Sequence, residues 1–156
     1  MPLGPEASAA IRSMRTLNRA ASEAMLSVEG VRACTDVTGF GLIGHACAMA
    51  AASQVTLLID TAPVPLLEGA YELVGRNKTG GGASNKDHFS RWARVSAGVD
   101  AALLDLCYDP QTSGGLLVAV DASQADILAA AFERNGVTAV RIGQAIPAQD
   151  ARVILN

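Results

Sequence analysis

One aspartate occupies a place in the chain where it could bind a metal ion. Asp36 follows a stretch that predicts a strand over residues 31–35, and Gly39 and Gly41 come shortly after it. Carboxylate oxygen is a ligand that Mg²⁺ prefers, beside water and phosphate oxygens. Glycines let the backbone approach a phosphate, and the amides of a following helix attract the same anion. Thr35, Asp36, Gly39 and Gly41 are therefore candidates for a metal and phosphate site. An aspartate beside a glycine turn is more often a turn former or helix cap, and spacing alone favours that interpretation.

A second polar segment precedes a predicted strand over residues 116–120. It reads Asp-Pro-Gln-Thr-Ser-Gly-Gly from Asp109 to Gly115. Pro110 fixes a turn and biases Asp109 away from helix, whereas the two glycines permit two backbones to pack closely. We favour a structural loop that holds residues 35–41 in place over direct contact with a substrate.

Three consecutive glycines form a further candidate for phosphate binding. Successive amides of Gly80, Gly81 and Gly82, with Asn85 nearby, could cradle an anion. No Gly-Lys-Ser or Gly-Lys-Thr follows, so this is not a Walker loop. A flexible surface linker explains the glycines equally well, and we predict a mobile loop over residues 75–85.

His45 lies in a predicted helix over residues 42–52 that is apolar nearly all round. On such a helix we favour a packing histidine over a catalytic base. His45, Cys47 and His88 do not have the spacing of a zinc site. The G-x-S-x-G elbow of serine hydrolases is absent from the sequence.

Composition excludes several classes of protein. The chain has 156 residues, half of them apolar, which suits one domain with a sizeable core. A formal net charge of −3 argues against a general nucleic-acid binder. Three widely spaced cysteines indicate reduced thiols and a cytoplasmic protein. Residues 42–52 are too few to span a bilayer, and residues 1–4 do not resemble a signal peptide, so we expect a soluble protein.

Periodicity and turn residues predict alternating helices and strands. One helix should run from residue 5 to a stop at Gly30, and residues 55–59 should form an interior strand. Further helices are expected over residues 66–74, 88–92, 99–106 and 122–135, and further strands over residues 137–146 and, at a sheet edge, 152–155. This order predicts an α/β fold, a three-layer α/β/α sandwich.

Two segments together resemble one family. Residues 35–45 read Thr-Asp-Val-Thr-Gly-Phe-Gly-Leu-Ile-Gly-His, and residues 109–117 read Asp-Pro-Gln-Thr-Ser-Gly-Gly-Leu-Leu. Both are similar to signatures of the selenophosphate synthetases (selenide, water dikinases). The opening helix, with Met14, Leu17 and Asn18, resembles the helix that begins their second domain. Aminoimidazole ribotide synthetase and thiamine-phosphate kinase share the fold of this superfamily but not both signatures.

The resemblance implies that residues 1–156 form the single C-terminal domain of a two-domain enzyme. The N-terminal domain, which binds ATP and makes most of the dimer contact, would lie outside this chain. The family converts ATP, selenide and water to selenophosphate, AMP and phosphate, as homodimers that need Mg²⁺ and K⁺. Asp36 matches the family's metal-binding aspartate. No catalytic residue is expected here, and this part alone should be inactive.

Two departures from the family pattern stand out. Residues 79–85 keep the glycines and Asn85 of the family's glycine segment but lose its proline and a hydroxyl. The three cysteines do not match the family's catalytic cysteine or selenocysteine. Two other interpretations remain open: a non-catalytic binding or assembly module of the same fold, and part of another kinase of the superfamily.

Overall fold

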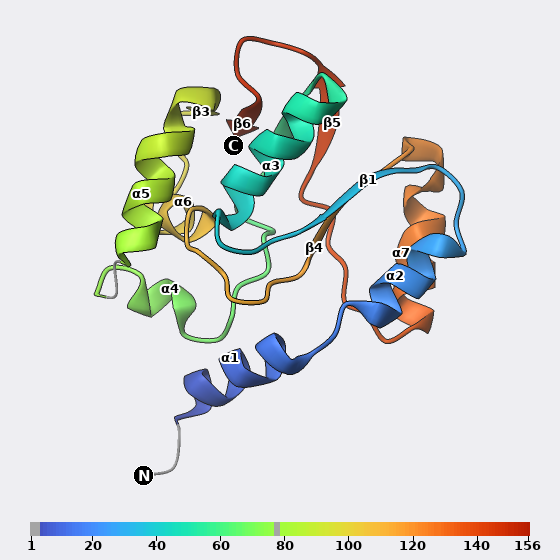
Figure 1. The fold of residues 1–156 in the computed structure, drawn as a ribbon, viewed down its shortest axis with the longest axis horizontal. Coiled ribbons are helices and arrows are strands. Elements are labelled where there is room, and N and C mark those ends of the chain that lie inside the picture. Colours follow the sequence, from blue (N-terminus) through green and yellow to red (C-terminus); the bar gives the residue numbers. More distant parts are fainter. Residues whose placement is uncertain (1–3, 77–78) are drawn as a thin grey trace.

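The computed structural model describes residues 4–76 and 79–156. It has an α/β fold in which the strands fall into two sheets (Figure 1). The elements along the chain are α1 (Pro5–Arg15), α2 (Arg19–Leu26), β1 (Val31–Asp36), α3 (Gly41–Ser53), β2 (Val55–Ile59), α4 (Ala70–Leu73), α5 (Gly80–Phe89), the 3₁₀ helix η1 (Ser90–Trp92), β3 (Ala93–Val95), α6 (Ala101–Cys107), β4 (Leu116–Val120), the 3₁₀ helix η2 (Ala122–Gln124), α7 (Ala125–Arg134), β5 (Gly143–Pro147) and β6 (Val153–Leu155).

The larger sheet has the strand order β3-β6-β2-β5. β2 is an interior strand, as its continuous apolar run predicts. It pairs parallel with β6 and antiparallel with β5. The expectation of an edge strand near the C-terminus is wrong, because β6 lies between β2 and β3 and all three of its residues are buried. The short strand β3, which we did not predict, forms that edge instead.

The smaller sheet pairs β1 with β4 in antiparallel register and has helices on both faces. Leu116, Val118 and Val120 pack against α2 and α7, whereas Leu117 packs toward the core around α3. An irregularity in the register between Val31 and Ala33 changes which face of β1 its side chains occupy. The order of layers is therefore α2 and α7, the β1-β4 sheet, α3, and the four-stranded sheet.

α3 is the central helix of the core. One face of this apolar helix is fully covered, with Ile43, Ala46 and Ala50 at 0 % exposure and Cys47 at 1 %. These residues pack with Leu57 and Ile59 of β2 and with β6. α3 also contacts β1, so it lies between the two sheets.

Several predicted elements have different bounds. The expected single helix over residues 5–30 is two helices, because the backbone of Thr16 is extended (ψ 121°) and ends α1; the Thr16 hydroxyl also donates to the carbonyl of Arg12. The expected helix over residues 66–74 is reduced to α4, and the strand over residues 137–146 is reduced to β5. Residues 137–142 make no strand, and the Val137 side chain packs on the cluster between α2 and α7.

Residues 80–85 are not the mobile loop that their glycines predict. They form the first part of α5, which begins after Thr79. The hydroxyl of Thr79 accepts a hydrogen bond from the amide of Gly82 at 3.0 Å, so the helix has a side-chain N-cap. Residues 77 and 78, which also belong to the expected loop, lie outside the described residues.

Candidate functional site

The turn between β1 and α3 carries the candidate metal ligand. Asp36 is the last residue of β1, and its side chain is exposed. Gly41, the first residue of α3, has φ +68°, a left-handed conformation that favours glycine. A β-carbon on Gly41 would lie 2.9 Å from the carbonyl oxygen of Cys107. Glycine is thus required here both by the backbone conformation and by the close passage of the chain that leads to residue 109.

The segment of residues 109–115 supports that turn through backbone hydrogen bonds. The amide of Val37 donates to the carbonyl of Gly115 at 2.9 Å, and the amide of Gln111 donates to the carbonyl of Thr38 at 3.1 Å. A β-carbon on Gly114 would collide with the carbonyl oxygen of Val37. These contacts agree with the structural loop favoured on sequence grounds.

α5 brings the glycine segment to the same place. A β-carbon on Gly81 would lie 2.9 Å from the ring of Pro110, so the start of α5 packs directly on the second segment. The amide nitrogen of Asn85 donates to the carbonyls of Gly39 and Tyr108, at 2.9 and 3.0 Å. Gly80 is exposed, and a β-carbon there would meet no atom within 4 Å. Asn85 therefore contacts the turn itself, although it is separated from Gly39 by 46 residues.

His45 also contacts the turn. Its Nε2 accepts a hydrogen bond from the amide of Thr38 at 3.0 Å and lies 3.2 Å from the hydroxyl of the same residue. The ring packs against Phe40, with centroids 5.5 Å apart. His45 is half-buried and belongs to the first turns of α3. It is neither a simple core histidine nor a base with a free nitrogen at Nε2.

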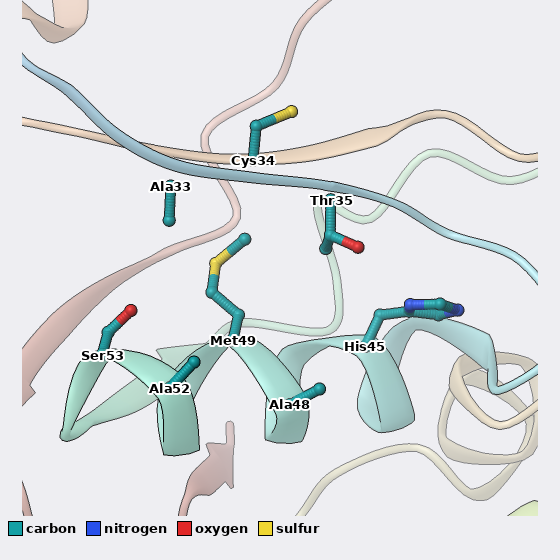
Figure 2. A pocket seen from close by; sticks show the side chains of 8 residues that line it. All are labelled: Ala33, Cys34, Thr35, His45, Ala48, Met49, Ala52 and Ser53. Atoms are coloured by element: carbon teal, nitrogen blue, oxygen red, sulfur yellow. The ribbon is translucent and has the colours of Figure 1, made fainter.

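A hollow of about 300 Å³ lies between β1 and α3. Figure 2 shows that Thr35 and Ala33 point from β1 toward α3, whereas the Cys34 sulfur points away from the helix. Met49 and His45 line the opposite side. The lining is mostly apolar, so this hollow offers few groups that could bind an anion.

Burial makes the thiols poor nucleophiles. It raises the pKa of Cys47 and of Cys107 to about 11. The pKa of Cys34 is raised by burial and by the neighbouring charge of Asp36. The thiolate is the reactive form of cysteine, and the raised pKa values leave all three thiols mainly protonated near neutral pH, although Cys34 is exposed.

Comparison with known proteins identifies the family. The family described as "AIR synthase related protein, C-terminal domain" matches residues 5–156. This chain belongs to that family. The α/β class that the sequence predicts is the one the structure has.

Three curated relatives share one name. A "Selenide, water dikinase" of Geobacter metallireducens is 43% identical over 147 residues, which are 94% of this chain and 42% of that protein. One of Caldanaerobacter subterraneus is 46% identical over 76% of this chain and 34% of the relative. One of Trichlorobacter lovleyi is 40% identical over 94% of this chain and 42% of the relative. The chain therefore spans between about one third and two fifths of the length of these relatives. The family resemblance found in residues 35–45 and 109–117 is confirmed.

Asp36 suits a magnesium ion by the chemistry of its donor atoms. Within residues 4–76 and 79–156, no group of three or more His, Cys, Asp or Glu side chains could hold a metal ion. In that same part of the chain, no hydrogen bond or ion pair occupies the Asp36 carboxylate. One carboxylate is enough where phosphate oxygens and water complete the shell of Mg²⁺. Asp36 would hold the ion together with groups outside the described residues.

The sequence interpretation missed the residues that hold the site together. Thr79 was not singled out, although a threonine before a helix is a common N-cap. Asn18 was noted only for its family resemblance, yet its amide lies 3.4 Å from the carbonyl of Gly114. The sequence offers one indication of the contact between His45 and Thr38: the two residues are seven positions apart, across a predicted strand-to-helix turn. No local signal connects Asn85 to Gly39 or Tyr108.

Proposed function

We propose that this chain is the C-terminal domain of a selenide, water dikinase, which forms selenophosphate, AMP and phosphate from ATP, selenide and water. One observation carries the proposal. The two segments that resemble the family signatures are separated by residues 46–108 and are bonded to each other through Val37, Thr38, Gln111 and Gly115. Asp36 is exposed and directly precedes Val37, the first of these bonded residues. The name of the relatives supports the same assignment.

The proposed contribution of this domain is one metal ligand on a rigid support. Asp36 would hold Mg²⁺, which neutralises phosphate charge during phosphoryl transfer. The amides at the start of α3, which have no side-chain cap, and the exposed Gly80 and Gly81 are our candidates for contact with ATP phosphates. Thr35 precedes Asp36 in β1, and Gly39 belongs to the turn that follows Asp36.

The remaining parts of the proposal concern the whole enzyme. ATP and selenide would bind with the help of the part of the enzyme that the relatives have beyond this domain. We assign the nucleophile to that part, because the pKa values of all three thiols here are raised. We further propose a homodimer that requires K⁺ besides Mg²⁺, does not bind nucleic acid, and works in the cytoplasm. Among the described residues, no helix is long and apolar enough to cross a membrane.

A chimeric enzyme tests the proposal. The chain replaces the matching 147 residues of the Geobacter metallireducens relative, and selenide-dependent formation of AMP is measured. We expect activity in the chimera and none in the chain alone or in the relative's remaining part alone. A chimera that folds and dimerises like the relative but forms no AMP would contradict the proposal and favour a non-catalytic module of this fold.

A further inference from the structure

The turn after Asp36 is held on one side by a histidine in a defined tautomer. The Thr38 amide donates to Nε2 of His45 at 3.0 Å. A backbone amide can only donate, so Nε2 must be without a hydrogen and the ring hydrogen must lie on Nδ1. Figure 2 shows the His45 side chain on the side of α3 that faces β1. The Nε2 lone pair is therefore committed to the turn.

On its other side the turn is held by a buried amide. Asn85 is 8 % exposed, and the same side-chain nitrogen lies within 3.0 Å of the carbonyl oxygens of Gly39 and Tyr108. Carbonyl oxygens only accept, so the atom between them must be the nitrogen of the amide, which has two hydrogens to give. Both side-chain hydrogens of Asn85 are therefore donated to backbone carbonyls, one at Gly39 and one at Tyr108.

The peptide groups between these two contacts are bonded as well. The Thr38 carbonyl accepts from the amide of Gly41 at 2.9 Å and from that of Gln111 at 3.1 Å. The amide of Thr38, the carbonyl of Thr38 and the carbonyl of Gly39 thus all have partners fixed by α3, α5 or residues 109–115. Little freedom is left to the backbone that follows Asp36.

We propose that His45 and Asn85 are positioning residues for Asp36, and that neither of them contacts the substrate. The proposal rests on the proposed function, because Asp36 is the group they position. A base at position 45 would need a ring nitrogen with a free lone pair, but Nε2 accepts from Thr38 and Nδ1 carries the ring hydrogen. A phosphate contact through the nitrogen of Asn85 would need a free amide hydrogen. In the structure, the side-chain nitrogen of Asn85 donates to the carbonyls of Gly39 and Tyr108. A preorganised carboxylate avoids reorganisation when the metal and phosphate charges assemble, which accelerates the chemical step rather than the binding of substrate.

The first test needs only this chain. Long-range ¹H–¹⁵N correlation spectra should show His45 protonated at Nδ1 and unprotonated at Nε2. Glutamine places its amide oxygen near the position of Nε2, so His45→Gln should keep an acceptor that His45→Ala lacks. We expect the Thr38 amide to exchange roughly tenfold faster in His45→Ala, the effect of losing one hydrogen bond, and at nearly the normal rate in His45→Gln. His88→Ala, a change in the other histidine of the sequence, should leave that rate unchanged.

The second test measures kcat in the chimera, calculated from the concentration of folded enzyme. Asn85→Asp keeps the shape of the side chain but removes both donor hydrogens. We expect His45→Ala and Asn85→Asp each to lower kcat by about 10- to 100-fold, the range for a small misplacement of a catalytic group. Both should raise the Mg²⁺ concentration needed for half-maximal rate, with little change in KM for ATP. His45→Gln should recover most of the rate.

The matched control for the second test is Asn135→Asp, which removes an amide that donates to the Ala131 carbonyl in the distant α7 region. It should leave kcat unchanged. A hydrogen on Nε2 of His45, an unaltered Thr38 exchange rate in His45→Ala, or normal kcat and Mg²⁺ dependence in both variants would each overturn the positioning role. An inactive wild-type chimera would instead refute the proposed function, and the spectra of the chain would still decide how the turn is held.

Discussion

Gly114 lies so close to Val37 that any β-carbon on Gly114 would collide with the carbonyl oxygen of Val37. This contact explains the glycine at position 114, whereas a β-carbon on Gly115 would meet no atom within 4 Å. Two backbones pass each other here without an intervening side chain, and the amide of Val37 bonds to the next carbonyl, that of Gly115. Residues 109–115 thus pack against the turn after Asp36 and hold its backbone by hydrogen bonds.

The close passage of Gly41 along residues 107 and 108 predicts a large loss of stability on substitution. Gly41 and Gly136 both have φ +68°, but a β-carbon on Gly136 would meet no atom within 4 Å. Gly136→Ala should therefore cost only the left-handed strain, about 1–2 kcal/mol of unfolding free energy. Gly41→Ala should cost about 1–3 kcal/mol more, because its β-carbon also overlaps the backbone.

Chemical denaturation of both variants measures this difference. Gly136→Ala is the matched control, since its backbone conformation is the same and only its surroundings differ. Equal losses in the two variants would mean that the chain at residues 107–108 moves away easily, and that Gly41 is required for its conformation alone.

The N-cap of α5 predicts a loss of stability when Thr79 is replaced. Thr79 supplies the oxygen that accepts from the Gly82 amide. Thr79→Ala should lower the unfolding free energy by about 1 kcal/mol, the usual effect of losing an N-cap, whereas Thr79→Ser should retain most of the stability. Hydrogen exchange at Gly82 should become faster in the alanine variant only. Unprotected amides throughout Gly80–Phe89 in the wild-type chain would instead favour the mobile loop expected from the glycines.

Asp109 predicts a dependence of stability on pH. Burial raises the pKa of its carboxyl, and hydrogen bonds from Thr79 and Gln111 only partly oppose this. The folded chain therefore holds the proton to higher pH than the unfolded chain does. The stabilising contribution is complete below the unfolded pKa of about 3.9 and is lost as pH rises through the raised folded pKa.

Replacing Asp109 by asparagine should remove this dependence. Asparagine stays neutral and can present its oxygen to Gln111 and its nitrogen to Thr79. Melting temperatures should shift in favour of Asp109→Asn as pH rises from about 3 to 6, because only the wild type must bury a charge. The exposed Asp150 provides the control substitution to asparagine. A constant difference between wild type and Asp109→Asn over this range would show that the carboxyl ionises as freely folded as unfolded.

Local patterns predicted the elements whose burial is decided by their own residues. The apolar run of β2 and the apolar face of α3 need large buried surfaces wherever they are placed. The break between α1 and α2 has no such signal, because the apolar stripe continues through Leu17, which is 78 % exposed. Likewise β6 is interior only because β3, a three-residue strand, covers its outer side.

The same limit applies to the site. The places of Asp36 at a strand end and of Gly41 in the turn could be predicted, because a strand, a carboxylate and a glycine turn follow one another in the sequence. The helix of α5 could not, since glycine has a low helix propensity and Asn85 is fixed by carbonyls of two distant loops. Tertiary hydrogen bonds thus decided the structure of the residues for which local propensity was weakest.

Asp36 itself provides the most direct test of the proposed chemistry. In the chimera, Asp36→Asn keeps the shape of the side chain but removes the charge that would hold Mg²⁺. Because transition-state charge depends on the metal, kcat should fall by at least roughly 100-fold, the scale of losing one charge-stabilising group. The melting temperature should change little, since the carboxylate is exposed and no hydrogen bond or ion pair joins it to another described residue. Asp150→Asn is the control for a change of surface charge. If Asp36→Asn lowered the melting temperature and left the kcat of the remaining folded enzyme intact, Asp36 would be a turn former and no metal ligand.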